Sequence, residues 1–158
     1  MLAELNLKNR EMSSSCVVGE YLYIGTYVDA LFIFELSAFK TPSTGLLTAK
    51  HTVETTDSIL TICSLTADGK TVAIGQAGGF VDLVVDFEFK KDDGIVMKEA
   101  GYINKIIKCS YDEKNNTAEA FEIVMACERG IFLANYSAKT QKLHLMNEEK
   151  YLEDCLVS

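Results

Sequence analysis

Cysteine is the residue type whose spacing in this sequence first suggests chemistry. Cys16, Cys63, Cys109 and Cys155, four of the five cysteines, follow one another at intervals of 47, 46 and 46 residues. A thiolate metal site usually contains Cys-x-x-Cys pairs or nearby histidines, and the sequence contains neither arrangement. Because cysteine is also a small apolar residue that suits tight packing, we expect no metal site. The spacing predicts a structural repeat with cysteines on its innermost strands, and redox sensitivity remains an alternative role for them.

The other groups that could perform catalysis or bind phosphate show no recognisable arrangement. His51 and His144 are not placed beside a serine or cysteine that either could activate as a general base. Residues 75–79 are glycine-rich, but they lack the lysine and the hydroxyl residue of a phosphate-binding loop. We therefore expect no catalytic residue, no cofactor and a non-enzymatic protein.

The charge of the chain excludes two classes of partner. Fifteen basic residues against twenty-three acidic ones leave a net charge of −8, whereas binding to nucleic acid or to an anionic membrane requires clustered positive charge. No apolar run approaches the ~18 residues of a membrane helix. The first residues lack the basic stretch and apolar block of a signal peptide. Together with unpaired cysteines, these features predict a cytoplasmic protein.

The interval between the cysteines coincides with a repeat of strands and turns. In each unit a short apolar strand, a polar turn and a second apolar strand follow in that order, and the second strands end at Gly25, Gly75 and Ala126. Third strands are predicted over residues 30–34, 80–85 and 130–134. Four strands repeating every 46 to 51 residues are typical of the blades of a β-propeller.

Each third strand leads into a turn rich in glycine, proline or short polar residues, which accept tight backbone geometry. These turns are predicted at residues 41–45, 91–94 and 138–141. A more polar fourth strand closes each unit, as at residues 46–51. We expect one partial propeller domain over residues 1–158, with blades over 13–53, 57–101 and 103–147 and the first strand of a further blade over 150–157.

Two segments of the second unit resemble the WD-repeat family. Residues 57–70 are similar to its first strand and Ser-Pro-Asp-Gly turn, and residues 72–76 to its second strand. The chain departs from the family in having no tryptophan, and Thr55-Thr56 replace the usual Gly-His pair. The hydrogen-bonded tetrad of the family therefore cannot form from its usual side chains.

A second resemblance concerns lactonase-type seven-bladed propellers. It is carried by residues 22–27, 31–34 and 44–47, which are similar to an opening blade of those proteins. This resemblance implies a hydrolase as the alternative function. No matching catalytic acid or arginine cluster accompanies it.

Three blades do not close a propeller, which generally has four to eight. Residues 2–7 alternate like an outer strand without a blade of its own. We expect an incomplete ring with two uncovered apolar faces, and such faces favour association. The chain could belong to a longer propeller, close a ring as a homodimer, or be completed by another protein.

The WD-repeat resemblance implies a scaffold that binds a protein or peptide partner through loops at one end of the propeller. The loop residues predicted to contact the partner are Tyr27, Asp29, Glu54, Asp57, Gln76, Glu128 and Arg129. Acidic residues outnumber basic ones in these loops. We therefore expect a basic partner, while a purely structural role in an assembly remains a third hypothesis.

Overall fold

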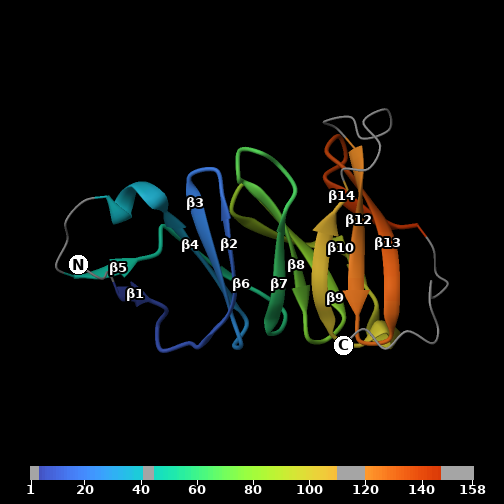
Figure 1. The fold of residues 1–158 in the computed structure, drawn as a ribbon, viewed down its shortest axis with the longest axis horizontal. Helices are drawn as coiled ribbons and strands as arrows, with labels where there is room; N and C mark the ends of the chain where they lie inside the picture. Colours follow the sequence, from blue (N-terminus) through green and yellow to red (C-terminus); the bar gives the residue numbers. More distant parts are fainter. Residues whose placement is uncertain (1–3, 41–44, 110–119, 147–158) are drawn as a thin grey trace.

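Three four-stranded antiparallel sheets stand side by side in the protein (Figure 1). The computed structural model describes residues 4–40, 45–109 and 120–146, and no α-helix occurs among them. Blade 1 contains β2 (Met12–Val18), β3 (Tyr21–Thr26), β4 (Ala30–Glu35) and β6 (His51–Glu54). Blade 2 contains β7 (Ile59–Ser64), β8 (Thr71–Gln76), β9 (Phe80–Val85) and β10 (Glu88–Val96). Blade 3 contains β11 (Ile103–Lys108), β12 (Ala120–Cys127), β13 (Gly130–Ser137) and β14 (Lys142–Leu145).

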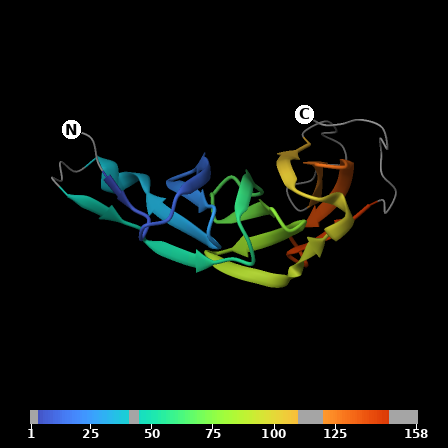
Figure 2. The same ribbon diagram turned by 90° about the horizontal axis from the view of Figure 1, so that it is seen from below.

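The blades form an open arc. Each first strand contacts the first strand of the next blade, β2 with β7 and β7 with β11, and Figure 2 shows the outer strands spread along the convex side. None of the described sheets closes on itself. The predicted all-β, propeller-like arc of about three four-stranded antiparallel blades is therefore confirmed.

The segment predicted as the fourth strand of blade 1 has a different role. The chain leaves β4 through the short 3₁₀ helix η1 (Leu36–Phe39), and β5 (Leu46–Thr48) then pairs in parallel with β1 (Glu4–Asn6). Only β6, from His51 onward, pairs with β4. The prediction of a fourth strand over residues 46–51 was wrong, because this segment packs instead against the outer face of blade 1.

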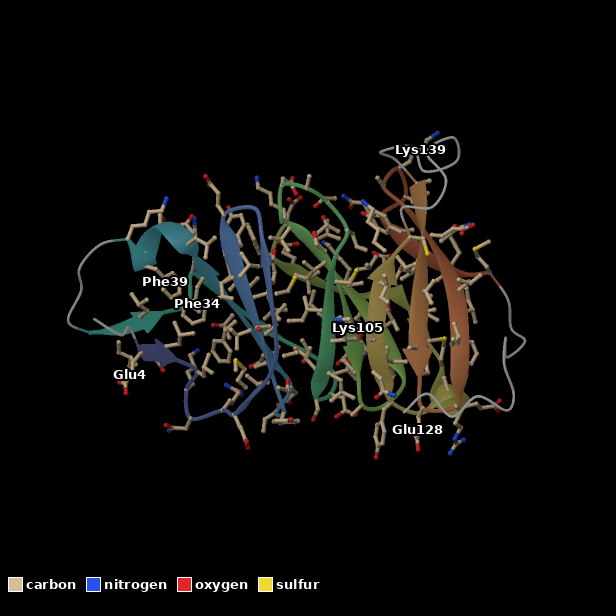
Figure 3. All side chains as sticks on the ribbon, in the orientation of Figure 1. Glu4, Phe34, Phe39, Lys105, Glu128 and Lys139 are labelled. Atoms are coloured by element: carbon tan, nitrogen blue, oxygen red, sulfur yellow. The ribbon has the colours of Figure 1, made fainter. Side chains whose placement is uncertain are left out.

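β1 and β5 form a cap over the N-terminal face of the arc. Leu5, Leu7 and Leu47 pack against a buried cluster that contains Phe32 and Phe34. Figure 3 shows Phe34 and Phe39 at this end of the arc, near Glu4 of β1. Only one of the two expected uncovered faces is therefore present among the described residues, because the cap buries the other.

The tight turn of blade 2 lies at a different position from the predicted one. β9 and β10 are joined by Asp86 and Phe87, both with positive φ (49° and 66°), as a two-residue hairpin turn requires. Residues 91–94 lie inside β10, where its register against β9 shifts between Lys90 and Ile95. The turn predicted there was wrong, whereas the turn at residues 138–141 is confirmed between β13 and β14. Residues 41–44 and 150–157 lie outside the described residues.

Neighbouring blades are held together by apolar clusters and by two glycine sockets. The cluster between blades 1 and 2 includes Tyr23, Leu31, Ile33, Ile74 and Val84, and the larger one joins blades 2 and 3. A Cβ atom on Gly25 would lie 2.7 Å from Cγ2 of Ile59, and one on Gly75 would lie 2.5 Å from Cγ2 of Ile103. The missing side chain at the end of each second strand thus admits an isoleucine from the next blade.

Candidate interaction surface at the linker end

The loops predicted to bind a partner lie at one end of the arc, here called the linker end. It carries the turns between the second and third strands of each blade and the links between blades, Thr55–Ser58 and Met97–Tyr102. Because the three antiparallel sheets run in the same sense, all of these segments emerge on the same side. Figure 3 shows Glu128 at this end, at the bottom of the view.

Tyr27 and Asp29 occupy the turn of blade 1. The Tyr27 backbone N–H donates to the Glu11 carbonyl at 3.1 Å, and the Ser58 hydroxyl donates to the Tyr27 carbonyl. The Thr55 N–H donates to the Asp29 carbonyl at 2.9 Å. The Tyr27 ring is 50% exposed and the Asp29 side chain is also exposed. The backbone of this turn is thus bonded to the first inter-blade link, while its side chains face solvent.

Glu54 precedes the same link, and Asp57 lies within it. Glu54 is exposed at the end of β6, opposite Ala30 of β4. Asp57 is half-buried, and its carboxylate accepts the Ser58 N–H at 2.7 Å. A Cβ atom on Gly78 would lie 2.7 Å from Asp57 Oδ2, so the turn of blade 2 approaches this carboxylate closely.

Gln76 lies at the linker end, but its side chain is fully buried. Its carbonyl oxygen accepts the Asp57 N–H at 2.8 Å, and its amide nitrogen donates to the carboxylate of Asp82. Gln76 therefore anchors the first link to blade 2 from inside. Gln76 was predicted to contact a partner, but its buried side chain instead holds Asp57 in place. The other predicted loop residues reach the surface.

Asp82 is a functional candidate that sequence reasoning missed. Asp82 in β9 pairs with Ile74 in β8. The equivalent residues in the third strands of blades 1 and 3 are Phe32 and Phe132. Of the three blades, blade 2 alone therefore has a carboxylate at this position. The side chain is 3% exposed. Burial raises its pKa to about 6, while hydrogen bonds from Gln76 and Thr56 and the charge of Lys91 act in the opposite direction.

The signal for Asp82 in the sequence is a polar residue in an apolar third strand. Its carboxylate and the Gln76 amide form a buried polar contact next to the inter-blade link, in a chain that lacks the usual tetrad residues. Buried polar groups are tolerated when they are hydrogen-bonded. This pair therefore connects β8, β9 and the first link in blade 2.

Glu128 and Arg129 occupy the turn of blade 3. The Glu128 N–H donates to the Tyr102 carbonyl at 2.9 Å, and the Arg129 N–H donates to the Ala100 carbonyl at 3.1 Å. Gly101 has φ +73°, and a Cβ atom there would lie 2.2 Å from Glu128 Oε2. Both charged side chains are exposed. The second link, which includes the 3₁₀ helix η2 (Lys98–Ala100), is thus fixed to its blade by backbone bonds, as the first link is.

The linker end combines acidic and aromatic side chains. Among the described residues its exposed acidic groups are Glu11, Asp29, Glu54, Glu99 and Glu128, and none of them forms an ion pair. Arg129 is an exposed cation in the turn of blade 3. Two tyrosines, Tyr27 and Tyr102, are about half exposed, at 50% and 52%. The surface is therefore acidic and contains aromatic rings accessible to a partner.

The cysteines do not share one structural position. Cys16 pairs with Tyr23 and Cys63 with Ala73, but the equivalent pair in blade 3 is Ile107 with Val124. The predicted register of Cys109 was wrong by two residues, because the repeat shortens from 47 residues between Cys16 and Cys63 to 44 between Cys63 and Ile107. Blade 1 is the longer unit because η1 and β5 lie between β4 and β6, whereas β9 and β10 are joined by two residues. Cys155 lies outside the described residues.

None of the described cysteines forms a disulfide. Burial raises the pKa of Cys16, Cys63 and Cys109, and it raises that of Cys127 to about 12. Within residues 4–40, 45–109 and 120–146, no group of three His, Cys, Asp or Glu side chains is arranged to hold a metal ion. Cys63 and Cys127 belong to the apolar cluster between blades 2 and 3, and Cys16 packs against the cluster between blades 1 and 2.

Comparisons with known proteins identify the fold. No family model and no curated protein sequence matches the chain. Among solved structures, the chain is similar to the Dos1 propeller (TM-score 0.60, 14% identity), covering 89% of this chain and 37% of that one. It is also similar to Sqt1 of Saccharomyces cerevisiae (TM-score 0.58, 14% identity), covering 85% of this chain and 34% of Sqt1. None of the described helices is long and apolar enough to cross a bilayer. The described residues thus have the fold of a three-bladed arc of a β-propeller, and the chain spans about a third of the length of each of these two proteins.

Proposed function

We propose that the protein is a non-enzymatic interaction scaffold whose linker end binds a basic segment of a protein partner. The observation that carries this proposal is the set of exposed carboxylates on Asp29, Glu54 and Glu128 together with two half-exposed tyrosines. The chain is similar to the Dos1 propeller, and the step from this fold to binding through loops is made by analogy.

Lysine and arginine side chains suit this surface for two reasons. Carboxylates attract them over several ångströms and form charge-assisted hydrogen bonds with them at contact. The exposed faces of Tyr27 and Tyr102 can also bind a cation, which adds about 0.5–1 kcal/mol at an exposed site. An acidic segment would meet repulsion at the same positions.

The surface is pre-organised, which favours binding because little ordering is needed. The first link is bonded to the turns of two blades, since Thr55 N–H donates to Asp29 and Ala77 N–H donates to the Ser58 carbonyl at 3.0 Å. The Met97 N–H donates to the Gly79 carbonyl at 2.7 Å at the start of the second link. Rigid loops lose less conformational entropy when a partner binds.

The free thiols support a reducing compartment, and we place the interaction in the cytoplasm. A homodimer that closes a ring, or completion by blades of another chain, is compatible with this role because both leave the linker end accessible. Neither assembly is required for binding of a basic segment.

The test is charge reversal at the linker end with a charge-matched control. The variant Asp29→Lys, Glu54→Lys, Glu128→Lys is compared with Glu20→Lys, Glu88→Lys, Asp92→Lys, which changes exposed acidic residues outside that end by the same amount. The probe is an array of fluorescent peptides ranging from strongly basic to strongly acidic. We expect the native protein to prefer basic peptides and the first variant to lose roughly tenfold in affinity or more. Equal binding of acidic and basic peptides, or an equal loss in the control, refutes the proposal.

A further inference from the structure

The outer face of blade 3 is the apolar face that remains uncovered among the described residues. Val124, Ala126, Ile131 and Leu133 lie on it and are half-buried, and Ile107 on the same face is 53% exposed. The opposite face of these strands packs against blade 2, through residues such as Met125 and Ala134. One face of blade 3 is therefore covered by blade 2, and the other face is uncovered among the described residues.

The uncovered positions are those that the other blades use to bind the next blade. Ala126 pairs with Ile131, as Gly25 pairs with Leu31 and Gly75 with Val81. Leu31 and Val81 are fully buried by the following blade. In the same register, the outer face of blade 3 presents apolar residues where blades 1 and 2 contact the next blade. Ala126 lies at the position of Gly25 and Gly75.

The sequence after β14 repeats the sequence that enters blade 3. Residues 145–157 correspond to residues 96–108 at an offset of 49, without a gap. The matches are Met97 with Met146, Glu99 with Glu148, Tyr102 with Tyr151 and Ile103 with Leu152. In this alignment six residues separate Leu145 from Leu152, the same number that link β10 to β11.

We propose that residues 152–157 bind the outer face of blade 3 as a further innermost strand, with Leu152 seated against Ala126. Leu152 takes the place that Ile59 occupies against Gly25 and Ile103 against Gly75. Cys155 corresponds to Ile106, which is 3% exposed, and Leu156 corresponds to the exposed Ile107. The side chains of Leu152 and Cys155 therefore face blade 3, while that of Leu156 points away from it.

The shapes of the paired residues support this seating. In the two sockets a Cβ atom would meet Cβ and Cγ2 of the isoleucine from the next blade, and also the Ser14 hydroxyl or the Thr61 methyl of the glycine's own blade. Leucine has no Cγ2 on its Cβ atom, so it leaves room for the methyl group of Ala126. A glycine thus faces an isoleucine at two blade contacts, Gly25 with Ile59 and Gly75 with Ile103. At the proposed third contact an alanine faces a leucine.

A second copy of the chain is a poorer occupant, because the cap of β1 and β5 covers the face that such a copy would present in a closed ring.

Alkylation of Cys155 tests the proposal in the intact chain. The protein is treated with N-ethylmaleimide, and each cysteine is followed by peptide mass spectrometry. The buried Cys63 and Cys127 serve as internal standards that the blades remain folded. We expect Leu152→Asp to speed modification of Cys155 about tenfold or more, whereas Leu156→Asp leaves it slow.

A conservative exchange tests the register without adding charge. Leu152→Ile alone should speed the modification of Cys155, and adding Ala126→Gly should restore protection, since it recreates the glycine and isoleucine pair. The proposal is overturned if Cys155 reacts as fast in the native protein as in Leu152→Asp. It is also overturned if Leu152→Asp and Leu156→Asp change the rate of Cys155 modification equally. Protection that disappears on dilution also overturns it, because a second copy would then supply the cover.

Discussion

Replacing Asp82 with asparagine should stabilise the protein in a pH-dependent manner. The pKa of this carboxyl is raised from 3.8 to about 6 by burial, so the folded protein favours the protonated form. Its contribution to stability is fully present below the unfolded pKa and is lost as the pH rises through the folded pKa. A shift of about two pKa units corresponds to about 3 kcal/mol. The neutral asparagine does not incur this loss.

The measurement is urea unfolding, followed by circular dichroism, of both proteins between pH 4 and pH 7.5. The free energy of unfolding of Asp82→Asn, minus that of the native protein, should increase by about 2 to 3 kcal/mol from pH 4 upward and level off above the folded pKa of about 6. Taking the difference cancels the other titrating groups. Unequal m-values would instead indicate a change in the unfolded or folded ensemble.

Asp68 provides a control with the opposite sign. Its pKa is lowered by the Thr66 hydroxyl and the Lys70 N–H, so its contribution is present at neutral pH and lost as the pH falls. The same difference for Asp68→Asn should therefore decrease as the pH rises. The reasoning is refuted if the Asp82→Asn difference is independent of pH or follows the direction of Asp68→Asn.

Two further substitutions test the packing of the arc. Gly75→Ala should cost about 1–3 kcal/mol in unfolding free energy, since the added methyl meets Ile103, whereas Gly45→Ala has open space and should be neutral by the same urea assay. Leu47→Ala should loosen the cap, lower stability by about 1–2 kcal/mol and increase binding of an apolar dye, while the 54% exposed Leu46 should tolerate alanine. Equal effects within either pair would contradict the packing described above.

Much of the architecture could be predicted because it depends on local pattern. The alternation of apolar residues and the polar turns determine where strands start and stop, and their recurrence predicts blades without knowledge of any long-range contact. The linker end also followed from the order of the strands, since antiparallel connections fix which turns share an edge. Tyr27, Asp29, Glu54 and Glu128 reach the surface there.

Other features depended on contacts between residues distant in the chain. Leu46 and Leu47 suit a fourth strand as well as a cap, and only the uncovered phenylalanines of blade 1 select the cap. The cysteine intervals agree to within one residue, yet the η1 and β5 segment makes blade 1 longer than blade 2, so Cys109 lies two residues out of register.

The amino-acid sequence alone determined the repeat, the strand order and the acidic end of this protein, because these follow from composition and short-range periodicity. The tertiary structure decided which apolar face is covered and that Gln76 lies inside. It also decided that Asp82 replaces a phenylalanine at a buried site. The physical reason is that burial is a property of neighbours in space. The desolvation of a carboxylate, or the covering of a sheet face, depends on residues that the local pattern does not identify.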